Sequence, residues 1–64
     1  MKFKIKEVRQ KRGFTQTELA RRAGVTRVMI WALESSKWED VSVGNLYRIA
    51  AVLGCKMDDL VEDE

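Results

Sequence analysis

The side chains that most often perform chemistry in proteins are scarce in this chain of 64 residues. It has no histidine and a single cysteine, Cys55. Without histidine it has no imidazole base, no histidine metal ligand and no Ser-His or Cys-His pair. One cysteine excludes an internal disulfide and a thiolate zinc cage. We therefore expect no catalytic activity, no cofactor and no metal ion.

The charged residues are divided unevenly along the chain. Residues 1–37 carry ten Lys and Arg against three Glu, and residues 38–64 carry two basic against seven acidic residues. The formal charges of the two parts are therefore +7 and −5, which sum to the net charge of +2. A basic half favours nucleic acid as a partner, although the same charges could simply keep both halves soluble.

The spacing of apolar residues predicts one domain of short helices. Residues 2–6 alternate like a strand, but the pattern that continues to residue 12 favours a helix from about Lys4. The predicted helix N-caps are Thr15, Thr26 and Ser42. The glycines predicted to end helices are Gly13, Gly24 and Gly54. A short fifth helix is expected at about 57–61, in a part of the chain that frays.

Two of the predicted helices follow one another closely. Glu18 stands three residues after Thr15, which is the capping-box pattern at the start of the first of them. Only Val25 separates its terminal Gly24 from the next N-cap, Thr26. Helices joined by so short a turn must cross steeply, and that is the helix-turn-helix arrangement.

The residues around this turn resemble the Cro and phage-repressor family of helix-turn-helix proteins, also called the XRE family. The matching segments are, in order, Gly13–Ala20, Ala23–Thr26, Ile30, Leu33–Ser35, Lys37, Leu46–Gly54 and Asp58–Leu60. They cover nearly the whole chain at the family's spacing. The resemblance implies an all-α, compact, five-helix domain of the lambda-repressor type over residues 1–61, followed by an acidic tail at 62–64.

The resemblance also implies a function. It indicates a bacterial or phage-type transcriptional regulator, most simply a repressor, that binds a palindromic operator in double-stranded DNA as a homodimer, which could form only on DNA. The second helix would cross the DNA backbone and the third would enter the major groove. By position, the base-reading residues are Arg27, Val28 and Ala32. The backbone-contacting residues are Gln16, Thr26, Ser35 and Lys37, although Gln16 and Thr26 could act only at helix starts. Arg9 and Glu34 match a structural ion pair between the first and third helices.

The outward face of the third helix departs from the family pattern because it is mostly apolar. On a helical wheel it holds Val28, Trp31 and Ala32. In one interpretation, Val28 and Ala32 contact thymine methyls, Arg27 binds guanine and Trp31 packs on sugar-phosphate, so the half-sites are T-rich. In the other, this surface and Met29 bind a protein, and the chain is an interaction adapter or antitoxin. The basic first half favours DNA.

Further expectations concern the dimer interface, Trp38, Cys55 and the compartment of the protein. Dimer contacts are expected from the fourth and fifth helices, with Met57 and Val61 as candidates. Trp38 could cover the edge of the core, join a dimer interface or contact the DNA backbone, and Cys55 should pack as a small apolar residue. We expect no membrane-spanning segment, no signal peptide and no small-molecule site. A free thiol favours a reducing compartment, so we expect a cytoplasmic, nucleoid-associated protein with no membrane partner.

Overall fold

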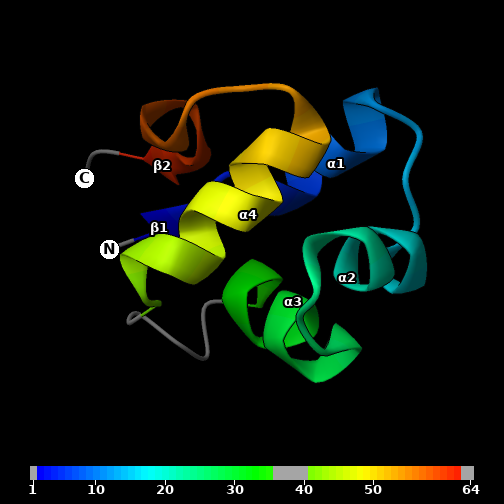
Figure 1. Cartoon of the computed structure of the whole chain (residues 1–64). Helices are drawn as coiled ribbons and strands as arrows, with labels where there is room; N and C mark the ends of the chain where they lie inside the picture. Colours follow the sequence, from blue (N-terminus) through cyan, green and yellow to red (C-terminus); the bar gives the residue numbers. More distant parts are fainter. Residues whose placement is uncertain (1, 36–40, 63–64) are drawn as a thin grey trace.

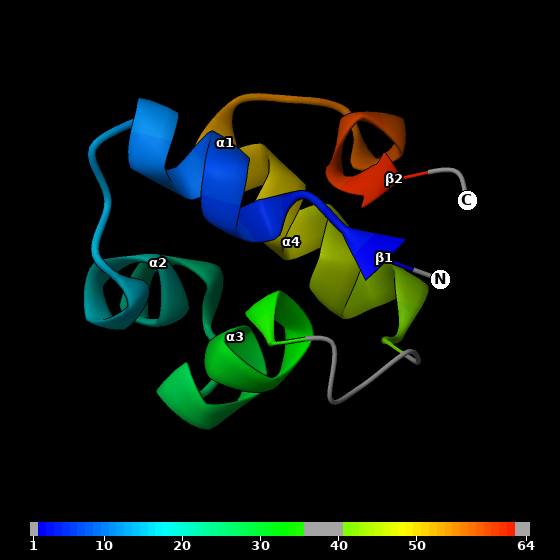
Figure 2. The same ribbon diagram turned by 180° about the vertical axis from the view of Figure 1, so that it is seen from behind.

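The computed structural model describes residues 2–35 and 41–62. Its elements are, in order, β1 (Lys2–Phe3), α1 (Ile5–Lys11), α2 (Gln16–Ala23), α3 (Arg27–Glu34), α4 (Val43–Leu53), the 3-10 helix η1 (Met57–Leu60) and β2 (Val61–Glu62). Figure 1 shows α2 and α3 together at one end of the molecule. The two short strands lie near the chain termini, which Figure 2 shows from behind.

The predicted helix boundaries are confirmed by local hydrogen bonds. The side-chain oxygens of Thr15, Thr26 and Ser42 each accept the backbone N–H three residues further on, at 3.0, 3.0 and 3.1 Å. Gly24 and Gly54 end α2 and α4 with φ of 72°, a left-handed conformation that side chains with a Cβ rarely adopt. These signals lie within a few residues of one another, so they are readable from the local sequence.

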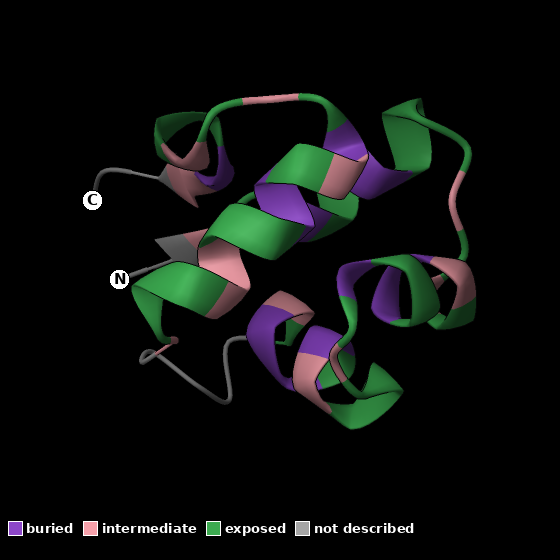
Figure 3. Cartoon of the chain, in the orientation of Figure 1, coloured by how far each residue is buried: buried purple, intermediate pink, exposed green. Residues whose placement is uncertain are grey.

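A single apolar core holds the short helices together, as the burial colours of Figure 3 show. Its largest fully buried side chains are Ile5, Leu19, Ile30, Leu33, Ile49, Leu53 and Leu60. Every α-helix and η1 contributes at least one of them. Burying one such side chain stabilises the fold by roughly 1.5–3 kcal/mol, whereas isolated helices of this length are marginal in water. Tertiary packing therefore maintains these helices.

The prediction of a compact, all-α domain is confirmed, but two details differ from the predicted five-helix arrangement. The described residues form four α-helices, and the fifth helix is the 3-10 helix η1. In addition, β1 and β2 pair antiparallel, with Phe3 opposite Val61 and Lys2 opposite Glu62. The strand-like alternation at the start of the sequence therefore corresponds to a real strand, but only over Lys2–Phe3. Its partner lies almost the whole chain away, where no alternation is long enough to be recognised.

The C-terminal segment, which we predicted to fray, is held in place. Leu60 is fully buried, and its carbonyl accepts the Lys4 N–H at 2.7 Å. The Asp59 side chain accepts the backbone N–H of Lys56 at 3.1 Å, which is the reciprocal half of a capping box and ties the start of η1 to its third residue. Within the described ranges, no helix has the length and apolar character needed to cross a membrane.

Candidate nucleic-acid interface

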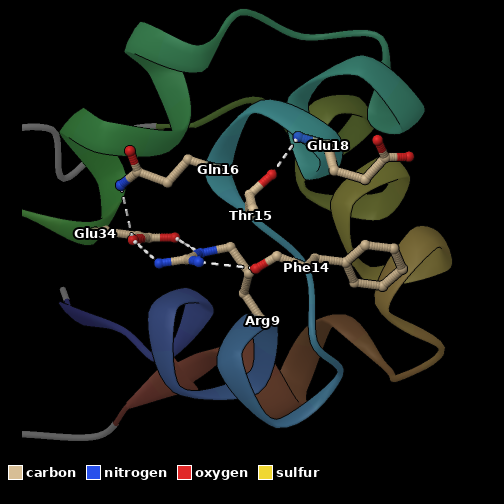
Figure 4. Close-up of polar contacts among 6 residues, drawn as sticks. All are labelled: Arg9, Phe14, Thr15, Gln16, Glu18 and Glu34. Atoms are coloured by element: carbon tan, nitrogen blue, oxygen red, sulfur yellow. Dashed lines mark hydrogen bonds and ion pairs between the residues drawn. The ribbon is translucent and has the colours of Figure 1, made fainter.

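An ion pair between α1 and α3 anchors the helix-turn-helix to the first helix. Arg9 donates from Nε to Glu34 Oε2 at 2.7 Å and from Nη2 to Oε1 at 3.0 Å (Figure 4). Arg9 also donates from Nη1 to the Phe14 carbonyl at 2.9 Å. Arg9 is 8% exposed and the Glu34 side chain 3%, and the hydrogen bonds that Arg9 donates to Glu34 raise the pKa of Arg9. The predicted structural pair is thus confirmed, in the two-pronged geometry that arginine makes with a carboxylate.

Gln16, the first residue of α2, is joined to this pair. Its Nε2 donates to Glu34 Oε1 at 3.0 Å, across 18 positions of the sequence (Figure 4). The family resemblance implied that Gln16 contacts the DNA backbone, and the hydrogen bond to Glu34 was not predicted. Nothing in the local sequence signals it, because the two residues meet only when α2 and α3 have folded together.

The exposed part of α3 is narrower than the helical wheel predicts. Val28 is 62% and Trp31 47% exposed, and with the exposed Arg27 they line a shallow hollow of about 350 Å³. Ala32 is only 2% exposed, so its predicted place on the base-reading face is wrong. The wheel takes no account of neighbouring chain, and a methyl side chain is short enough to be covered completely. Met29, half-buried, packs against the core.

The remaining predicted contact residues lie at the ends of α3. Thr26 is exposed at the N-terminus, where its hydroxyl oxygen is used in the cap. Ser35 is exposed at the C-terminus, and its N–H donates to the Trp31 carbonyl at 2.9 Å. Lys37 and Trp38 lie outside the described residues.

A second carboxylate, that of Glu18 on α2, is also bound by arginines. Glu18 Oε2 accepts from Arg21 Nη2 at 2.6 Å and from Arg22 Nε at 2.5 Å. These hydrogen bonds, from Arg22 first and then Arg21, lower the pKa of Glu18. The guanidinium of Arg22 also lies 5.2 Å from the centre of the Phe14 ring, a cation–π contact. Arg21 and Arg22 are exposed, and both are paired with the carboxylate of Glu18 on their own helix.

Cys55 packs in the way expected of a small apolar residue. It is half-buried against the core, and burial raises the pKa of its thiol. A raised pKa keeps the sulfur neutral and weakly nucleophilic near neutral pH. Among the described residues, no three His, Cys, Asp or Glu side chains are grouped so as to hold a metal ion.

Comparison with known proteins identifies the family. A family model described as "Helix-turn-helix" matches residues 5–60. The chain belongs to the XRE family of helix-turn-helix transcriptional regulators. A relative from Archaeoglobus fulgidus, named as an HTH-type transcriptional regulator, is 42% identical over 60 residues, which are 94% of this chain and 84% of that protein. Another from Methanothermobacter thermautotrophicus is 46% identical over 54 residues, 84% of this chain and 77% of the relative. The family's members therefore include archaeal proteins as well as the bacterial and phage proteins that the resemblance suggested.

Solved structures of one bacterial regulator share the fold. The N-terminal DNA-binding domain of SinR from Bacillus subtilis superposes with a TM-score of 0.87 at 28% identity, covering 95% of this chain and 88% of that one. SinR, the master regulator for biofilm formation, in complex with DNA gives 0.83 at 29% identity, covering 86% and 87%. The homologues and the fold are thus those of DNA-binding transcriptional regulators.

Proposed function

We propose that this regulator is a repressor that binds a palindromic operator as a homodimer, with α3 in the major groove. The observation that carries the proposal is the exposed sector of α3 formed by Arg27, Val28 and Trp31. Arg27 would donate to a guanine edge and Val28 would contact thymine methyls. Trp31, with one N–H donor, would pack against sugar-phosphate. The half-sites should therefore be rich in T.

The DNA backbone would be held by residues at the starts of α2 and α3 and by residues that follow α3 in the sequence. These residues are Gln16, Thr26, Ser35 and Lys37. The first two belong to helix N-termini, where unpaired N–H groups and the helix dipole favour phosphate. Backbone contacts of this kind supply much of the affinity but little of the sequence preference.

The dimer would form through α4 and η1, on a different face from α3. A hollow of about 370 Å³ lies there, lined by Tyr47, Ala50, Ala51, Cys55, Lys56 and Met57. Val43 and Tyr47 on α4 are 71% and 62% exposed. A two-fold dimer reads two half-sites in opposite directions, which is why the operator would be palindromic. A dimer bound to the operator would block polymerase. The protein would act at the nucleoid, in the cytoplasm.

Selection from a random duplex pool at near-physiological salt tests this function. Sequencing the bound fraction should reveal a two-fold motif with T-rich half-sites, and the spacing of the half-sites reports the dimer geometry. Binding without enrichment, lost as salt rises, would leave only phosphate attraction and reject sequence-specific recognition. The matched variants are Arg27→Ala, which should reduce discrimination among sequences, and Lys37→Ala, which should weaken all sequences alike. Equal loss on operator and random DNA for Arg27→Ala would reject its base-reading role.

A second candidate function is protein binding through the same face of α3. It is favoured by the exposure of Val28 and Trp31, since large apolar side chains are enriched at protein interfaces. A SinR protein/SinI protein complex also shares the fold, with a TM-score of 0.81, although this chain covers only 52% of the matched chain. A partner protein that changes Trp31 fluorescence in the absence of DNA, with no sequence enriched in the selection, would favour this alternative.

A further inference from the structure

We infer that Glu34 is a positioning residue for DNA binding, which acts through Gln16. The inference rests on the proposed function, because it assumes that Gln16 contacts a phosphate. Glu34 Oε1 accepts two donors at once, Arg9 Nη2 at 3.0 Å and Gln16 Nε2 at 3.0 Å. The same oxygen therefore links the ion pair between α1 and α3 to the first residue of α2 (Figure 4).

The hydrogen bond fixes how the Gln16 carboxamide is presented. An amide nitrogen carries two hydrogens, and Glu34 accepts one of them. The second remains available for a phosphate oxygen. A free glutamine side chain loses rotamer freedom when it binds, whereas Gln16 is already held by a carboxylate that Arg9 keeps in place. Prior ordering of one such side chain raises affinity by about twofold to tenfold.

Charge alone predicts the opposite effect of Glu34. A carboxylate at the DNA interface repels phosphate, so its removal should tighten binding if charge were the only contribution. Positioning predicts that removing Glu34 weakens binding. The ion pair with Arg9 offsets the repulsion, because it places a positive charge 2.7 Å from the carboxylate. When both members of the pair are removed, charge alone predicts no change in affinity, whereas positioning predicts weaker binding.

The test is the double variant Arg9→Met/Glu34→Leu, which removes one charge of each sign and keeps the net charge of +2. Replacing both members of a buried pair with apolar residues usually preserves folding, which circular dichroism would check. We expect operator affinity to fall about fivefold per half-site. Gln16→Ala should weaken wild-type binding but add little to the double variant. The matched control is Glu18→Gln, which also removes a carboxylate bound by arginines and should not weaken binding.

A measurement on the wild-type protein covers the case in which the double variant does not fold. The side-chain amide protons of Gln16 should exchange with solvent more slowly than those of Gln10, the chain's other glutamine, which is exposed. Equal exchange rates, wild-type affinity in the double variant, or an undiminished effect of Gln16→Ala in it would each overturn the inference. If wild type enriched no operator, the proposed function would fail instead, and the exchange rates would still report on the hydrogen bond.

Discussion

Two carboxylates in this molecule, Glu34 and Glu18, make nearly the same set of contacts in different surroundings. Each accepts hydrogen bonds from guanidinium groups at 3.0 Å or less. Glu34 binds an arginine 25 positions away on another helix, and its side chain is 3% exposed. Glu18 binds two arginines three and four positions along its own helix, and its side chain is 32% exposed.

The difference shows that a list of contacts does not rank their importance. Water screens the cluster around Glu18 and can replace its hydrogen bonds, so breaking it leaves no unsatisfied charge. Around Glu34, loss of one partner leaves a charge with little water to solvate it. The buried pair also connects α1 to α3, whereas the ion pairs of Glu18 lie within α2. We expect substitutions at the two sites to differ accordingly.

The largest effect is expected for Arg9→Met. It leaves the Glu34 carboxylate buried without its ion-pair partner, at a cost of about 3–5 kcal/mol in the free energy of unfolding. Urea denaturation followed by circular dichroism would measure this. The double variant Arg9→Met/Glu34→Leu should recover most of the loss, because no charge remains unpaired. A urea midpoint for Arg9→Met equal to that of wild type would show that the pair is solvated like the cluster around Glu18.

An intermediate effect is expected for Thr15→Ala. This change removes the acceptor of the Glu18 N–H at 3.0 Å and should cost about 1 kcal/mol. Thr17→Ala is the matched control, because Thr17 is the second residue of α2 and is exposed. If both variants lowered the urea midpoint equally, the loss could not be assigned to the cap, because alanine has a higher helix propensity than threonine and should not destabilise α2 at position 17. The backbone N–H of Glu18 would then contribute no more to the free energy of unfolding than its side chain does.

The features of the fold that the sequence predicts are local. The caps at Thr15, Thr26 and Ser42 and the terminal Gly24 depend on residues three or four positions apart. The pair between Arg9 and Glu34 is long-range, and only the family resemblance pointed to it.

The features that were not predicted depend on contacts between residues that are far apart in the sequence. The Gln16–Glu34 hydrogen bond spans 18 positions, and the pairing of β1 with β2 joins the two ends of the chain. The burial of Ala32 depends on neighbours that a helical wheel omits. For the candidate site, the exposure of Arg27, Val28 and Trp31 on α3 was predictable from the sequence. The narrower exposed sector of α3 and the network that holds Gln16 were not.

The smallest effect is expected for Glu18→Gln, and it should be visible only at low salt. Because the arginines lower the pKa of Glu18, its contribution to stability is present above the ordinary glutamate pKa and is lost as pH falls through the lowered pKa. Exposed charges are screened at about 0.15 M salt, so the urea midpoint at neutral pH should not change measurably.

An NMR titration of Glu18 measures the cause of this small effect directly. Its pKa should lie below the ordinary value at low salt and move back toward that value as sodium chloride is added. A low pKa that resisted salt would mean that water does not reach the cluster. Glu18 would then resemble Glu34, and exposure would no longer explain why the two carboxylates differ.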